Sequence, residues 1–253
     1  MAPHFGVTMF TSHASTVGRL VGSVALAAVV SNLCVPALAH GQATPDGAGS
    51  NDSAGVAAVD SPSASDATLR LAYFDGSGMS PEVRQAMQEE VERVFGEVGV
   101  RVESLGPENM AEAMSVPGTF VLQVMVMAKA PSGWDLPPHA LGVYFNGKTY
   151  PPQAVYAFQP SIYKELDLDT RGESYLRPEE IGRAFGRVVA HEVVHALAPD
   201  HKHSGWGILG HAQDERSLLQ PQLSIRESAG EALRAGLTEI GEYLAADTEE
   251  ASQ

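Results

Sequence analysis

His191-Glu192-Val193-Val194-His195 is the stretch that decides how this chain folds and what it can bind. Two histidines four residues apart lie on one face of a helix, one turn above the other. Both imidazoles can then reach one metal ion, and Glu192 can point toward that ion without being needed as a ligand. His201, six residues past His195, offers a third nitrogen once the helix has ended. Zinc favours three protein ligands and one open position in a catalytic site.

The helix that carries the pair is predicted to begin at Pro178, where two following glutamates suit its positive end. Pro199 helps to end it, because the residue before a proline is pushed out of the α region. Four residues share one stripe of this helix at spacings of four, three and four: Ala184, Val188, His191 and His195. The two histidines are therefore expected to emerge from a buried face.

In type and spacing these residues resemble the signature of the metzincin zinc metalloproteases, H-E-x-x-H-x-x-G-x-x-H followed by a turn that contains methionine. The pattern is matrixin-like or archaemetzincin-like, with two departures. Ala198 stands in place of the glycine, and Leu209 stands where a matrixin-like spacing puts the methionine. The resemblance implies an α+β, zincin-like fold: a mixed twisted sheet with an active-site helix and a C-terminal helix.

The same resemblance implies a zinc-dependent endopeptidase, and the N-terminal pattern described below indicates that it is exported. Zn²⁺ would be held by His191, His195 and His201, with Glu192 as the general base that activates water against a peptide or protein substrate. Two other functions remain open. One is a catalytically inactive zincin that acts as a zinc-containing binding protein. The other is an exported zinc carrier that uses five histidines: His191, His195, His201, His203 and His211.

Three further side chains near the pair remain candidates for a role at the metal. His203 replaces His201 as the third ligand if the bend at Ala198 and Pro199 is unusual, and Asp200 competes through oxygen. His211 lies two residues after Leu209, where some metzincins carry a tyrosine that assists the transition state. The alternative for His211 is a solvent-facing side chain.

Composition indicates a folded protein with an acidic surface. The chain has 253 residues, 44% of them hydrophobic, which is enough for one domain with a core. A net charge of −15 makes nucleic acid and anionic membranes poor partners. The oligomeric state is not indicated by the sequence.

The N-terminal region has the pattern of a secretory signal peptide over residues 1–39. The apolar run from Leu20 to Val35 precedes the cleavage pattern Ala37-Leu38-Ala39. An uncleaved membrane anchor is the alternative, but the run is short for a full span. Cys34 is the only cysteine, so cleavage after Ala39 leaves nitrogen and oxygen ligands for any metal. The protein is therefore expected to be secreted or periplasmic, without stable membrane association.

Residues 40–67 are rich in small and polar residues and are expected to form a disordered linker or a short propeptide. The folded domain is expected over residues 68–253. Strands are predicted at 69–75, 100–105, 120–127, 141–145 and 154–159, with helices at 81–98 and from about Ser224. Strand 120–127 is expected to be buried on both faces, and Asn146-Gly147 predicts a two-residue hairpin.

The acidic stretch Glu165–Glu173 has a D-x-D pattern that offers oxygen ligands to calcium. A calcium loop would need another oxygen ligand at Arg171 and a glutamate at Pro178. A solvated loop leading into the helix at Pro178 fits the stretch better.

Overall fold

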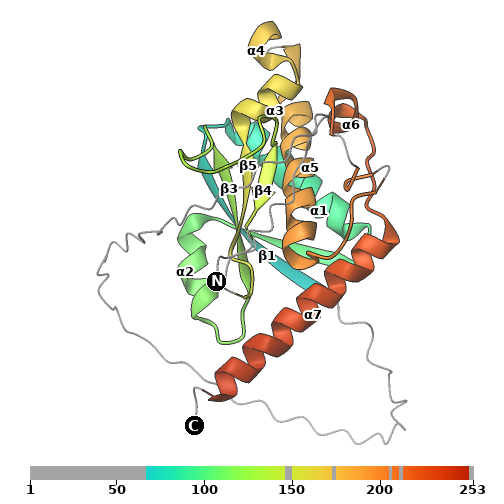
Figure 1. Ribbon diagram of the computed structural model, residues 1–253. Coiled ribbons are helices and arrows are strands. Elements are labelled where there is room, and N and C mark those ends of the chain that lie inside the picture. Colours follow the sequence, from blue (N-terminus) through green and yellow to red (C-terminus); the bar gives the residue numbers. More distant parts are fainter. Residues whose placement is uncertain (1–66, 146–149, 173–174, 205–206, 211–212, 251–253) are drawn as a thin grey trace, which may run out of the picture. The chain divides into compact units, whose positions relative to one another are not determined.

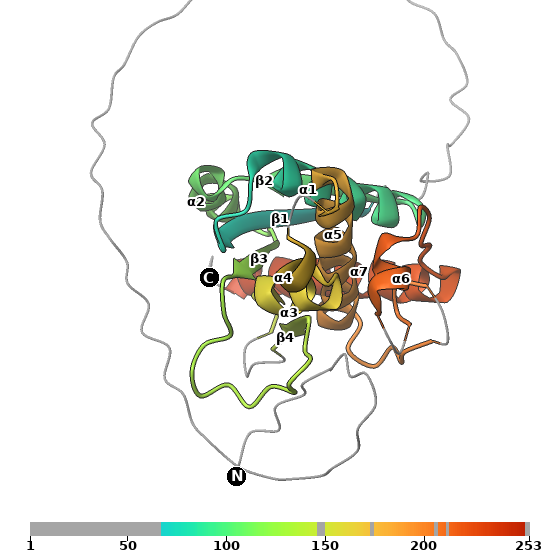
Figure 2. The same cartoon turned by 90° about the horizontal axis from the view of Figure 1, so that it is seen from above.

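A mixed five-stranded sheet forms the centre of the computed structural model and carries helices on both faces (Figures 1 and 2). The structure describes residues 67–145, 150–172, 175–204, 207–210 and 213–250, all of which belong to one compact unit. The elements follow in the order β1 (Ala67–Gly76), α1 (Pro81–Gly96), β2 (Val100–Leu105), α2 (Pro107–Ser115), β3 (Val121–Met127), β4 (Gly142–Tyr144), β5 (Ala154–Phe158), α3 (Gln159–Glu165), α4 (Leu168–Arg171), α5 (Pro178–Leu197), α6 (Glu215–Leu219) and α7 (Glu227–Glu250). This confirms the α+β class expected from the sequence.

The strand order across the sheet is β2-β1-β3-β5-β4. The pairs β1/β2, β1/β3 and β3/β5 are parallel, whereas β4 runs antiparallel to β5 along one edge. β3 is central, as predicted, but its side chains alternate between buried and half-buried. Only one of its faces is therefore fully covered. The register places Tyr144 opposite Val155, so residues 145–154 separate them and exclude a two-residue connection. Asn146-Gly147 itself lies outside the described residues.

The hydrophobic core lies between the sheet and the helices α1 and α5, which pack against each other and on the same face (Figure 2). Helix α1 begins where the sequence predicts, because the Ser80 hydroxyl accepts a hydrogen bond from the backbone N–H of Val83 at 3.3 Å. Gly99 then has φ +69°, a left-handed conformation that turns the chain into β2. Helix α5 spans the range expected from its apolar stripe.

The C-terminal helix α7, predicted from about Ser224, begins at Glu227 and runs to Glu250. Close approach explains part of its docking: a Cβ at Gly236 would lie 1.9 Å from the carbonyl oxygen of Leu197 at the end of α5. A Cβ at Gly230 would lie 2.5 Å from Val98. Gly236 therefore lets α7 lie directly on the end of α5, and Gly230 lets it lie against Val98, which follows α1.

Short helices replace two segments that sequence periodicity did not resolve. α2 connects β2 to β3, and none of its residues is buried, so it carries no apolar stripe to reveal it. α4 lies within the stretch 165–173 that was expected to be a loop, and α3 precedes that stretch. They project from the end of the sheet at the top of Figure 1.

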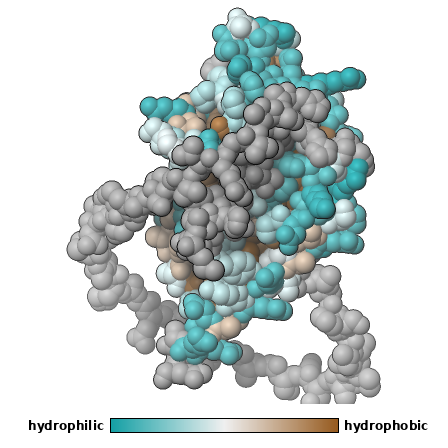
Figure 3. All heavy atoms as spheres, in the orientation of Figure 1, coloured by the Kyte–Doolittle hydropathy of each residue, from teal (hydrophilic) through white to brown (hydrophobic). Residues whose placement is uncertain are grey.

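The described surface visible in Figure 3 is mainly hydrophilic, with hydrophobic areas scattered across it. The exposed large hydrophobic side chains of the described residues are Met114, Val116, Tyr150, Tyr175 and Tyr243. Among the helices that the structure describes, none is long and apolar enough to cross a membrane. The expected signal peptide (1–39) and nearly all of the expected linker (40–67) lie outside the described residues, whereas β1 already begins at Ala67.

Candidate metal centre

Three imidazoles converge at the C-terminal end of α5. The Nε2 atoms of His191 and His203 are 3.2 Å apart, and those of His195 and His203 are 3.3 Å apart. His191 and His195 are buried and His203 is half-buried. Their ligand atoms all lie within 4.8 Å of one another. Among the described residues, these three histidines form the group whose side chains are close enough together to bind one metal ion.

The tautomer of His191 is set by the backbone. Its Nδ1 lies 2.9 Å from the carbonyl oxygen of Ile208, which can only accept, so Nδ1 carries the proton. The Nε2 lone pair of neutral His191 is then directed at the other two imidazoles. Burial, followed by the neighbouring His195, lowers the pKa of His191 well below its usual value. Burial, with His203 and His201 nearby, lowers the pKa of His195 to about 3.

This donor set fits zinc. Four ligands placed tetrahedrally at Zn–N distances of about 2.0–2.1 Å stand about 3.3 Å apart, close to the observed nitrogen separations. Neutral imidazoles are also the form that binds a metal. Lone pairs that face one another in a buried space repel unless a cation or a proton lies between them. The three histidines are therefore arranged for a cation of the size and preference of Zn²⁺.

The third histidine is where the structure departs from the expectation. His203 joins the pair, whereas His201 is not in the group. Helix α5 ends at Leu197, and Ala198 adopts φ −137°, ψ 67° rather than a left-handed conformation. The chain then turns, with the N–H of His201 bonded to the carbonyl of Ala198 at 2.9 Å. The backbone of His201 is thus part of the turn. His203, two residues later, is the histidine that joins the group.

The segment after the turn fixes His203 in place. The backbone N–H of Ser204 donates to the carbonyl of Leu209 at 2.7 Å, and Ser204 forms a bridge with Gly210. The residue before Ser204 is therefore held beside the turn whose Ile208 carbonyl binds His191. Leu209 is 4% exposed and supplies the apolar side chain expected at the methionine position. Asp200 is exposed and outside the group, and His211 lies outside the described residues.

Glu192 is fully buried beside the histidine pair. Neither of its carboxylate oxygens has a hydrogen-bond partner among the residues the structure describes. Burial raises the pKa of Glu192 well above its usual value. A carboxylate held dry and without a partner is costly, so its retention points to a chemical role.

Strand β4 forms the wall on which Glu192 rests. A Cβ at Gly142 would lie 2.8 Å from Cγ of Glu192 and 2.8 Å from the carbonyl oxygen of Tyr156. Tyr144, two residues along, stacks on His195 with ring centroids 6.1 Å apart and an interplanar angle of 14°. The structure thus selects β4, rather than β5, as the outer strand beside the site.

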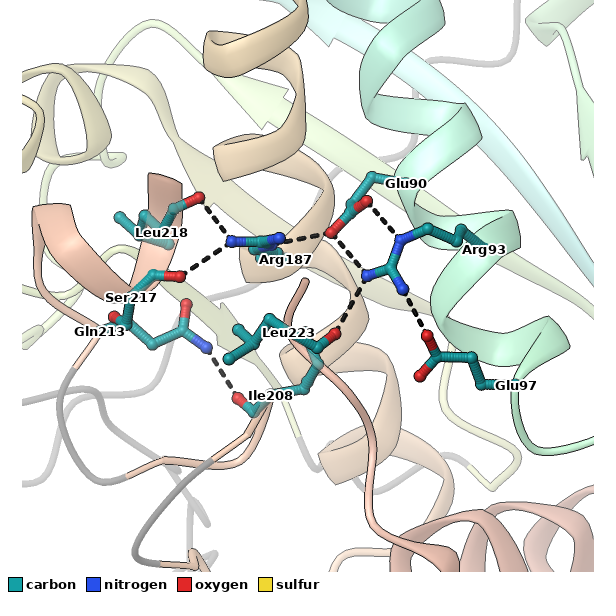
Figure 4. A network of polar contacts seen from close by, with 9 residues as sticks. All are labelled: Glu90, Arg93, Glu97, Arg187, Ile208, Gln213, Ser217, Leu218 and Leu223. Carbon is teal, nitrogen blue, oxygen red and sulfur yellow. Dashed lines mark hydrogen bonds and ion pairs between the residues drawn. The ribbon is translucent and has the colours of Figure 1, made fainter. Parts of the chain in front are cut away.

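A buried arginine of α5 binds the segment that follows the site (Figure 4). Arg187 lies one turn before His191 and is fully buried. Its Nε donates to Glu90 of α1 at 2.7 Å, and Nη1 donates to the carbonyl oxygens of Ser217 and Leu218 at 2.9 Å each. Helices α1, α5 and α6 are therefore joined through one side chain.

The acidic stretch before α5 is engaged internally. The Asp167 carboxylate accepts a hydrogen bond from the Thr170 hydroxyl and pairs with Arg171 at 2.6 Å. Arg171 also reaches Glu215 at 3.4 Å. These contacts favour the interpretation as a surface segment over a calcium loop, although Glu173 lies outside the described residues.

Several contributors to the site could not be recognised in the sequence. The carbonyl of Ile208 is backbone and leaves no signal, and Arg187 belongs to no motif that marks it as a buried partner of other helices. Gly142 carried a usable signal, because a glycine inside a strand often marks a close approach of other atoms. The choice of His203 over His201 depends on loop conformation.

No family model matches this sequence, and no curated protein matches it. The fold is similar to that of a solved structure, the crystal structure of archaemetzincin from Methanopyrus kandleri, with a TM-score of 0.43 and 14% sequence identity. The match covers 70% of this chain and 98% of that chain. The site itself consists of three converging imidazole nitrogens with a buried glutamate beside them.

Proposed function

We propose that this chain is a zinc-dependent endopeptidase whose metal is held by His191, His195 and His203. The observation that carries the proposal is the convergence of three Nε2 atoms beside a buried, unpartnered Glu192. Zinc bound there would acidify a water molecule and polarise the scissile carbonyl of a peptide. A metal-buffering protein has no need of a dry carboxylate, which favours the enzyme over a zinc carrier.

Glu192 has the properties of a general base in this proposal. Its carboxylate takes a proton from the attacking water and returns it to the leaving amine. Burial raises its pKa, and a cation close by favours the ionised form, so the two effects oppose each other. The backbone of Gly142 lies directly against Glu192, where a side chain would collide with it.

The outer edge of β4 is where an extended substrate would pair, in the manner of an added strand. β4 is the last strand of the sheet order, so one side of its backbone has no strand partner among the described residues. All three of its residues are buried. A substrate therefore reaches this edge only when the atoms covering it move aside.

Export is part of the same proposal. The apolar run and the small-residue cleavage pattern before His40 support it, and the acidic composition agrees with a protein that avoids anionic surfaces. N-terminal sequencing of the exported protein should begin at His40. A mature protein that still carries residues 20–35 would contradict export by this route.

The experiment that tests the activity is cleavage of a diverse peptide library by the full chain with one equivalent of zinc. Glu192→Ala is the matched variant, since it removes the base and leaves all three histidines. We expect the variant to bind zinc and to lose turnover by about 10²- to 10⁴-fold. Equal cleavage by both would contradict the role of Glu192. A folded, zinc-loaded wild type that cuts nothing would indicate a zinc-containing binding protein instead.

A further inference from the structure

The carbonyl oxygen of Ile208 is shared by two donors. His191 Nδ1 donates to it at 2.9 Å, and Gln213 Nε2 donates to it at 2.7 Å (Figure 4 shows the second bond). A carbonyl oxygen has two lone pairs, so both of its acceptor positions are filled. The direction of this carbonyl therefore depends on His191 and Gln213 together.

The peptide unit before this carbonyl, which carries the N–H of Ile208, is fixed as well. The N–H of Ile208 donates to the carbonyl of Ser224 at 3.1 Å. The preceding Gly207 has φ +81°, and a Cβ there would lie 2.7 Å from that same carbonyl oxygen. A backbone that needs glycine beside it and is bonded at both ends has little freedom to rotate. What remains adjustable is the carbonyl, and Gln213 is the side chain that holds it.

The side chain of Gln213 is placed to donate a hydrogen bond to the Ile208 carbonyl. Its side chain is 6% exposed, and its Oε1 has no hydrogen-bond partner among the described residues. An amide with one buried oxygen left unpartnered is an expensive choice for filling space. Among the described residues, its side chain makes one hydrogen bond, the one to Ile208. By contrast, Nδ1 of His195 has no partner in the described part of the chain, so this backbone support is particular to His191.

We propose that Gln213 is a positioning residue of the metal centre: by holding the Ile208 carbonyl it aims the Nε2 of His191 at the zinc. The inference rests on the proposed metal site. A ligand histidine usually donates its other ring nitrogen to an oxygen that fixes its tautomer and orientation. Here that oxygen is itself held by a second, buried side chain. Loss of such supporting contacts typically weakens metal binding by about 10- to 100-fold.

Gln213→Met is the substitution that tests the proposal in the full chain. Methionine keeps the length and approximate volume of glutamine but cannot donate to Ile208. It also removes the unpartnered Oε1, so the unfolding free energy of the zinc-free protein is expected to change little. Zinc affinity, measured by competition with a chromophoric chelator, is expected to fall about 10- to 100-fold. The visible spectrum of the Co²⁺-substituted variant should change as well, because it reports ligand geometry.

Gln222→Met is the matched control, since Gln222 is exposed on the same segment. It should leave zinc affinity and the Co²⁺ spectrum unchanged. Gln213→Leu, measured in the same way, serves if the methionine variant does not fold. Zinc binding by either folded Gln213 variant as tight as that of the wild type overturns the positioning role alone. Failure of the wild type itself to bind zinc overturns the metal centre and this inference together.

Discussion

At the residue scale, the third histidine decides the geometry of the proposed metal centre. His201 and His203 are separated by a single residue, and both are half-buried. Only His203 places its Nε2 within 3.3 Å of the other two. His201 influences the pKa of His195 without joining the group. Substitution of each in turn therefore separates a ligand from a neighbour.

His203→Ala is expected to weaken zinc binding by at least about 100-fold. Binding energies of structural zinc sites shared among four ligands amount to about 3 kcal/mol per ligand, which corresponds to a factor of this size. His201→Ala is the matched variant and should bind zinc within a few-fold of the wild type. A chelator competition titration of both variants measures the difference. The reverse ranking would show that His201 is the ligand.

At the scale of elements, α5 and β4 meet at a point that allows no side chain. Gly142 lies against Glu192 and Val188, both on α5, and against the backbone of Tyr156 on the next strand. Val188 Cγ1 would be 2.9 Å from a Cβ at this position. The strand can lie this close to the helix only because residue 142 is glycine. The position of Glu192 thus depends on a residue of another element.

Gly142→Ala is expected to lower turnover while zinc stays bound. The added methyl group must displace either Glu192 or the strand, and overpacking of this kind typically costs about 1–3 kcal/mol of unfolding free energy. Peptide cleavage and zinc content of the folded variant measure the two effects. Gly96→Ala is the control, because a Cβ there meets nothing within 4 Å. Full activity of Gly142→Ala would show that Glu192 does not depend on this contact.

At the scale of the whole molecule, a buried ionic network joins parts of the chain that are far apart in sequence (Figure 4). Glu90 of α1 accepts hydrogen bonds from Arg187 at 2.7 Å and from Arg93 at 2.8 and 2.9 Å. Arg93 also donates to the carbonyl of Leu223 at 3.0 Å. Burial alone raises the pKa of Glu90, but the hydrogen bonds and charges of the two arginines outweigh it and lower the pKa.

The lowered pKa gives the network a defined pH dependence. The ionised form of Glu90 is favoured by folding, so its contribution is complete above the unfolded-state value near 4.5. It is lost as pH falls through the lower folded-state pKa. We therefore expect the unfolding free energy of the wild type to decrease as the solution is acidified from about pH 5 toward pH 3.

Glu90→Gln is expected to remove this component of the acid dependence and to lower stability at neutral pH by about 3 kcal/mol. Removal of one partner leaves the Arg187 charge buried without compensation. Denaturant unfolding from pH 3 to 7 measures both effects. Glu89→Gln, on the exposed side of the same helix, is the control and should follow the wild type. An acid dependence retained in full by Glu90→Gln would place its origin in other carboxylates.

The regular elements that the sequence predicted were those in which a periodic apolar pattern coincides with a start or stop signal. α1 has the Ser80 cap and a buried stripe, and α5 and α7 show their stripes at helical spacing. α2 escaped prediction because it buries no residue. The turn between β4 and β5 was predicted too short, since a local Asn-Gly pair says nothing about where strand pairing begins.

The sequence by itself determined the helical placement of His191 and His195, since a four-residue spacing allows one arrangement on an α-helix. It also determined the carboxylate between them and the α+β class. Tertiary structure alone decided the third histidine, the carbonyl that orients His191, and the glycine against which Glu192 rests. Each of these depends on a loop or a strand that packing brings near α5. The spacing of residues along the chain does not predict the distances between such packed elements.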